Sequence, residues 1–153
     1  MPHPLGPVLG LDFGERRIGV ALSDPERLLA SGLTTLDRRR QPDVLGALQE
    51  IITKQKVTAI VLGYPSRTDG EKKPGDKTEA VDRFAESLRE RFTLPVHLED
   101  ESFTSALAAD SLRQRRGKRP SKPRDWNRAK AEIDRVAACY ILQDFLDRGG
   151  NSP

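Results

Sequence analysis

The order in which apolar patterns follow one another constrains the fold of this chain more than any other sequence feature. Three β-type runs come first, and helical and β-type segments then alternate to the end of the chain. The expected strands are 7–14, 16–24, 28–36, 57–65 and 94–101, and the expected helices are 44–52, 81–92, 104–117 and 127–147. This order predicts an α/β fold with a five-stranded mixed sheet flanked by α-helices.

The length and composition predict one domain that spans residues 1–153. The chain has 36% hydrophobic and 32% charged residues, which is typical of a soluble protein with a modest core. Its apolar runs are far shorter than the roughly 20 residues that cross a bilayer, and the first residues do not resemble a signal peptide. The single cysteine, Cys139, excludes an intrachain disulfide and a thiolate metal cluster. We therefore expect a cytoplasmic protein that binds no membrane.

Positive charge is concentrated near the C-terminus. Between residues 113 and 130 there are nine basic residues and one acid, Asp125. Such a segment attracts phosphate groups, although a solvated loop has the same composition. We expect a basic loop at about 113–127, and flexible tails at 1–6 and 149–153.

Three carboxylates occupy positions where a core residue or a strand end is expected. Asp12 ends the first apolar run, and Glu101 closes the run "VHLEDE". Asp134 lies on the apolar side of the last helix, because Ala137, Ala138 and Ile141 follow it at helical spacing. A buried acid costs free energy unless its charge is compensated, and Mg²⁺ or Mn²⁺ bound by carboxylate oxygens is one such compensation.

Each carboxylate also has a simpler explanation. Asp12 could form a turn, and Glu101 could be an acid in the first turn of the following helix. Asp134 could pair with Lys130, Arg135 or Arg16.

Two neighbours compete with Glu101 for its assigned role. Alternation along a strand places Glu99 and Glu101 on one face of the sheet and Asp100 on the other, so the pattern alone leaves the choice among them open.

Four motifs together resemble one known family. "LGLDFGERRIGVALSD", "VLGYPSRTDG", "PVHLEDESFTS" and "KAEIDRVAACYILQDFL" occur in the order and at the spacing of the YqgF family, over nearly the whole chain from Val8 to Leu146. These are small bacterial proteins with an RNase H-like fold, described as Holliday junction resolvases and as pre-16S rRNA nucleases. The resemblance therefore implies a nuclease that uses divalent metal.

The resemblance also assigns individual residues. Asp12 matches the acid of the family's first strand, Glu101 the acid of its Asp-Glu-Arg segment, and Asp134 the acid of its last helix, so Glu101 is favoured over its neighbours. Lys130 matches a lysine that precedes the helical aspartate. The chain departs from the pattern at Ser102, where the family usually has arginine, and in "GYP", where Gly-Leu-Pro is more usual.

The leading hypothesis is a metal-dependent nuclease for structured nucleic acid, with Asp12, Glu101 and Asp134 as catalytic residues that hold Mg²⁺ or Mn²⁺. Its substrate would be the 5′ end of the 16S rRNA precursor or Holliday-junction-like DNA. Symmetric cutting of a junction would require a homodimer, whereas trimming of rRNA would not. The residues expected to contact nucleic acid are Arg16, Arg17, Arg67, Lys72, Lys73, Arg115, Arg116 and Lys130.

Two other functions fit parts of the sequence. A non-catalytic RNA-binding factor for ribosome assembly would keep the fold and the basic surface without cutting. An actin-like phosphate-binding ATPase also opens with an aspartate and a glycine on a first hairpin, but it pairs two such domains, and this chain has room for one. In the nuclease, Gly14 and Gly19 would leave space for a nucleic-acid backbone.

Overall fold

The computed structural model describes residues 5–64, 77–100 and 123–150. The elements are β1 (Val8–Phe13), β2 (Arg17–Ser23), β3 (Ala30–Asp37), α1 (Val44–Gln55), β4 (Ala59–Tyr64), α2 (Lys77–Arg91), β5 (Val96–Asp100), α4 (Pro123–Phe145) and a final π-helical turn, η1 (Leu146–Gly150).

The five strands form one mixed sheet in the order β3-β2-β1-β4-β5. The first three strands are antiparallel neighbours, as expected for two successive hairpins. β4 pairs parallel to β1, and β5 pairs parallel to β4. The predicted five-stranded mixed sheet is therefore confirmed, with β1 as its central strand.

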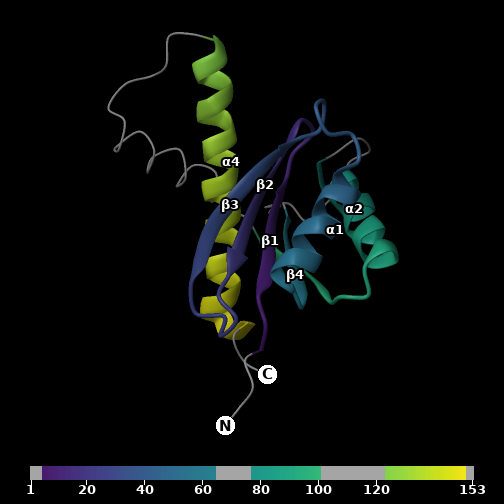
Figure 1. Cartoon of the computed structure of the whole chain (residues 1–153), viewed down its shortest axis with the longest axis vertical. Helices are drawn as coiled ribbons and strands as arrows, with labels where there is room; N and C mark the ends of the chain where they lie inside the picture. Colours follow the sequence, from purple (N-terminus) through teal and green to yellow (C-terminus); the bar gives the residue numbers. More distant parts are fainter. Residues whose placement is uncertain (1–4, 65–76, 101–122, 151–153) are drawn as a thin grey trace.

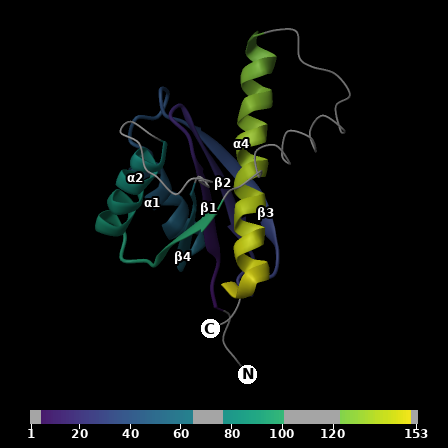
Figure 2. The ribbon, with the colours of Figure 1, turned by 180° about the vertical axis from the view of Figure 1, so that it is seen from behind.

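Helices cover both faces of the sheet. Figure 1 shows α1 and α2 on one face and α4 on the other. Figure 2, turned by 180°, brings the α4 face toward the viewer. Leu9, Leu11 and Phe13 of β1 belong to the core under α1 and α2. Val8 lies on the opposite face, in a smaller core with Leu142 of α4. β1 is thus buried on both faces, which explains its nearly continuous apolar sequence.

Local signals define the ends of α1. The Asp43 side chain accepts a hydrogen bond of 3.0 Å from the backbone N–H of Gly46, as an N-cap residue does. Lys56 ends the helix in the left-handed conformation, with its N–H bonded to the carbonyl of Ile52. The helix expected after Pro42 is therefore confirmed.

The last helix begins earlier than the sequence pattern predicts. α4 starts at Pro123, whereas we expected a helix from about 127 and a basic loop up to that residue. Proline is favoured in the first turn of a helix, because its fixed φ suits the helix and its missing N–H is not needed there. The helix expected at 104–117 lies outside the described residues. Within the ranges that the structure describes, no helix is long and apolar enough to cross a membrane.

α4 packs against β2 at a glycine. A Cβ atom added to Gly19 would overlap the backbone carbonyl of Asp134, so the helix backbone lies directly on the strand at this point. A backbone carbonyl of a packed helix has little freedom to move away. Gly19 therefore makes room for α4, not for a nucleic-acid backbone as its position next to the turn suggested.

We predict that Gly19→Ala lowers the free energy of unfolding by about 1–3 kcal/mol or more, because the added methyl group forces α4 away from β2. Urea denaturation followed by circular dichroism measures this change. Gly32→Ala is the matched control: its added Cβ would lie 2.8 Å from Cγ of the Arg135 side chain, which can move. Equal losses in the two variants would contradict the proposed role of Gly19.

Candidate active site

Asp12 is a buried carboxylate on the central strand. It lies one residue before the end of β1 and is 8% exposed. Side chains alternate along a strand, and Leu11 and Phe13 face the core under α1 and α2. Asp12 consequently faces α4. An acid in this position is part of the sheet rather than of the turn, so the Asx-turn explanation of Asp12 does not account for its burial.

Asp134 lies on α4 next to the same part of the sheet. Its backbone contacts Gly19, which is the residue directly opposite Asp12 in the β1–β2 pairing. Arg17 lies on the same face of β2 as Gly19, two residues earlier. These contacts bring the end of β1 and the middle of α4 together, as the three-carboxylate hypothesis required of Asp12 and Asp134.

Arg17 and Asp134 form an ion pair. Nε of Arg17 donates a hydrogen bond of 3.0 Å to Oδ2 of Asp134, and the two side chains are 15% and 27% exposed. An ion pair for Asp134 was one alternative to a metal site, but the expected partners were Lys130, Arg135 and Arg16. Lys130 is exposed instead.

Arg17 was expected to contact nucleic acid. The structure places its guanidinium at the carboxylate, where it also fixes the orientation of that group.

Glu101, the third predicted carboxylate, lies outside the described residues. Within the described ranges, no group of three or more His, Cys, Asp and Glu side chains is arranged to hold a metal ion. Asp12 and Asp134 still supply hard oxygen donors of the kind that Mg²⁺ and Mn²⁺ prefer. The described residues therefore supply two carboxylates, and a metal site built on them would need a further ligand.

Glu99 is a buried acid that the sequence offered as a rival of Glu101. It is 7% exposed and forms a salt bridge with Arg148 at the end of the chain's last helical segment. Among the described residues, its Oε1 atom contacts the Arg148 guanidinium without a well-directed hydrogen bond. Burial raises the pKa of Glu99 above its ordinary value of 4.5, and the charge of Arg148 only partly opposes this shift.

The position of Glu99 follows from its neighbours. His97 stacks on Phe145 of α4, with ring centroids 5.1 Å apart, so His97 and Glu99 both face α4. Asp100 points to the other face and is exposed. The strand register places Glu99 level with Asp12, two strands away on the same face of the sheet, and Arg148 pairs with it from the end of the chain.

The predicted nucleic-acid contacts are only partly described. Arg16 lies in the β1–β2 turn, partly buried, and its Nε has no hydrogen-bond partner in the described part of the chain. Lys130 is exposed one helical turn before Asp134. The other five predicted contacts lie outside the described residues: Arg67, Lys72, Lys73, Arg115 and Arg116.

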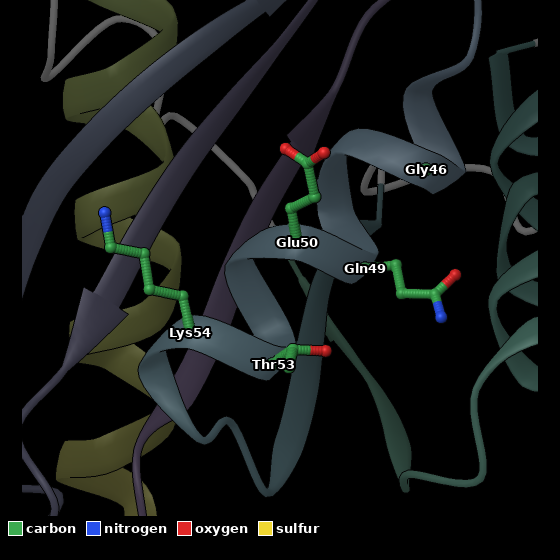
Figure 3. Close-up of a pocket in the computed structure, with 5 residues that line it drawn as sticks. All are labelled: Gly46, Gln49, Glu50, Thr53 and Lys54. Carbon is green, nitrogen blue, oxygen red and sulfur yellow. The ribbon is translucent and has the colours of Figure 1, made fainter.

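A surface hollow on the opposite face of the molecule is a different feature. Figure 3 shows its side chains on the outer surface of α1, and its lining residues are Gly46, Gln49, Glu50, Thr53 and Lys54. Because α1 covers the face of the sheet opposite to α4, this hollow is separated from Asp12 and Asp134 by the sheet. It is therefore no part of the candidate active site.

The described site thus consists of Asp12 on the central strand and Asp134 on α4, on one face of a five-stranded mixed sheet. The chain belongs to the RuvX family, described as Holliday junction resolvase, whose model matches residues 6–148. The expected YqgF resemblance and the expected nuclease class are thereby confirmed.

Curated relatives cover almost the whole chain. A protein of Koribacter versatilis is 42% identical over 145 residues, which are 95% of this chain and 89% of the relative. A protein of Moorella thermoacetica is 41% identical over 151 residues, covering 95% and 97%. Both carry the name "Putative pre-16S rRNA nuclease".

A solved structure shares the fold. The Fowlpox virus resolvase, in complex with its substrate Holliday junction DNA, is 10% identical, with a TM-score of 0.55 over 93% of this chain and 97% of its own. At this identity the likeness concerns the fold alone, and it confirms the expected RNase H-like architecture.

We predict that Glu99→Gln stabilises the protein increasingly as the pH rises above 4.5. The raised pKa means that ionised Glu99 costs stability in the folded state; below pH 4.5 the group is protonated in both states, and the cost disappears. Chemical denaturation at a series of pH values measures the difference from wild type. The control is Glu90→Gln, which neutralises an exposed glutamate on α2. A wild-type protein that gains stability over Glu99→Gln as the pH rises would contradict the assignment.

Proposed function

We propose that this protein is a nuclease dependent on Mg²⁺ or Mn²⁺ that hydrolyses phosphodiester bonds in structured nucleic acid. The observation that carries the proposal is the pair of carboxylates, Asp12 on the central strand and Asp134 on α4, on the same face of the sheet. The proposed substrate is the 16S rRNA precursor, because relatives about 40% identical are named pre-16S rRNA nucleases, and the proposed place of cutting is its 5′ end. Holliday-junction-like DNA is the second candidate, favoured by the description of the family.

Asp12, Asp134 and Glu101 are the proposed ligands of the metal. Glu101 is proposed because it matches the acid of the family's Asp-Glu-Arg segment, and it lies outside the described residues. When bound, a divalent cation lowers the pKa of water and neutralises charge on the phosphate.

The residues of the chain position the reacting groups. Nε of Arg17 donates a hydrogen bond to Oδ2 of Asp134 and so fixes the orientation of this carboxylate. Arg16 follows Asp12 by four residues, Lys130 precedes Asp134 by four residues, and each would neutralise a neighbouring phosphate. Burial of Asp12 under α4 excludes water from one side of the site, which strengthens the attraction between its charge and a cation.

We predict that Asp12→Asn lowers the rate of cleavage by on the order of 100-fold or more, since even residues that only support a metal ligand cost 10–100-fold. Purified protein is assayed with Mn²⁺ on precursor 16S rRNA and on a four-way DNA junction. Comparison of Glu101→Gln with Glu99→Gln separates the two candidate third ligands: we expect a comparable loss in the first variant and near-normal cleavage in the second.

Two results would contradict the proposal. An Asp12→Asn variant that cuts as fast as wild type would exclude the carboxylate site. A wild-type protein that binds precursor RNA equally well with and without metal, and cuts nothing, would instead indicate a non-catalytic assembly factor.

We predict that Arg17→Gln raises the affinity for Mn²⁺ by about threefold to tenfold, because it removes a positive charge that competes for Asp134. Isothermal titration calorimetry with Mn²⁺ measures the dissociation constant without any cleavage assay. Arg135→Gln is the control: Arg135 neighbours Asp134 in sequence, but its partner is Glu132, at 3.9 Å. An unchanged or weaker affinity in Arg17→Gln would mean that Arg17 does not compete with the metal.

A further inference from the structure

Three consecutive arginines follow β3 in a turn that Asp37 holds in place. The Asp37 side chain accepts a hydrogen bond of 3.0 Å from the backbone N–H of Arg39. Its backbone carbonyl accepts bonds of 3.1 and 2.8 Å from the N–H groups of Arg40 and Gln41. The bond from Arg39 is the main reason why the pKa of Asp37 is below its ordinary value, and the charge of Arg16 adds to it. The turn is therefore defined by its own hydrogen bonds.

Arg38 ties this turn to the turn between β1 and β2. Its backbone N–H bonds to the carbonyl of Arg16 at 2.8 Å. Its NH1 atom donates to the carbonyls of Gly14 and Glu15 at 3.2 and 3.1 Å, and its guanidinium lies 5.0 Å from the centre of the Phe13 ring. The side chain of Arg38 thus has a structural role beside the strand that carries Asp12.

Arg39 and Arg40 have no such role. Both are exposed, and neither guanidinium makes a hydrogen bond or salt bridge in the part of the chain that the structure describes. The carboxylate of Asp37, the nearest acid in sequence, is already bonded to the backbone of Arg39. The two guanidinium groups therefore project into solvent from a turn whose backbone is held by hydrogen bonds to Asp37.

The arginine turn adjoins the candidate active site. Asp37 is the residue opposite Arg17 in the β2–β3 pairing, and Arg17 is bonded to Asp134. A line of contacts therefore runs from the carboxylates, across the end of β2, to Arg39 and Arg40. Positive charge therefore continues from the site over the end of the sheet.

We propose that Arg39 and Arg40 form a phosphate-binding surface for the nucleic-acid strand that flanks the cut bond. The inference rests on the proposed nuclease function and specifies how its substrate is held. Guanidinium groups bind phosphates through paired hydrogen bonds, and a nucleic-acid strand that extends from Asp134 past Asp37 would meet this turn. Because phosphate contacts carry no base information, the surface contributes affinity and orientation for RNA and DNA alike.

The test is the salt dependence of binding, measured without cleavage. Fluorescence anisotropy in EDTA follows the binding of a labelled four-way DNA junction and of a labelled precursor segment of 16S rRNA. We expect Arg39→Ala/Arg40→Ala to weaken binding by on the order of tenfold at 0.1 M salt and to reduce the slope of log affinity against log salt by about 1.8 on duplex DNA. Both changes preserve the backbone N–H groups that bond to Asp37, so the turn itself should remain.

A charge-matched control separates the surface from general electrostatics. Lys54→Ala/Lys56→Asn removes two exposed positive charges at the end of α1, and asparagine tolerates the left-handed backbone of Lys56. Thr58, shortly after, bonds to the carbonyl of Pro7 before β1, so this control lies at the other end of the sheet. We expect its affinity and slope to match wild type.

The outcomes distinguish this proposal from the nuclease proposal. Equal affinity and slope in wild type and Arg39→Ala/Arg40→Ala would overturn the phosphate-binding surface and leave an acidic protein as the partner to test there. Equal losses in both double variants would also overturn it, because the effect would then be one of net charge. Neither result depends on cleavage, whereas the nuclease proposal is tested by the cleavage rates of the wild-type protein and of Asp12→Asn.

Discussion

The contact between α4 and β2 at Gly19 determines the geometry of the candidate site. Only a strand residue without a side chain allows the helix backbone to rest on the sheet there. This contact sets the depth of α4, and with it the position of Asp134 relative to Arg17 and to the strand that carries Asp12. The carboxylate on the helix is thus positioned by packing, and the quality of the site depends on a contact that involves no functional group.

The face of the sheet under α4 holds acids whose burial would cost free energy without a partner. In each of two observed ion pairs, an arginine compensates the charge of one of these acids. Arg17 reaches Asp134 from the sheet, and Arg148 reaches Glu99 from the end of the chain. A buried charge that loses its partner is far more costly than a pair that stays together. The two ion pairs differ in their consequence. A cation bound at the proposed site can replace Arg17 in compensating the charge of Asp134. The pair of Arg148 and Glu99 instead joins the last helical segment to the edge strand β5.

Sequence patterns predicted the sheet and its flanking helices, because apolar periodicity is local and each element carries its own. They also singled out Asp12 at the end of the first strand and Asp134 on the apolar side of the last helix. The partner of Asp134 was not predictable, since Arg17 is separated from it by 117 residues and looks like any exposed basic residue of a turn. The start of α4 was missed because charged residues obscure the helical period there. The role of Arg38 was missed because its contacts are backbone carbonyls and a ring of another strand.

Because β1 pairs with a strand on each side, a change in its register would alter both the fold and the proposed site. β2 and β4 fix the register of β1, with Asp12 opposite Gly19 and Leu11 opposite Leu62. Side chains alternate between the faces, so a shift of β1 by one residue would exchange Asp12 with a leucine or phenylalanine of the main core. Such a shift would bury the carboxylate among apolar side chains and turn a phenylalanine toward α4. Mispaired chains would therefore be both unstable and inactive, which leaves no folded population in which the carboxylate is misplaced.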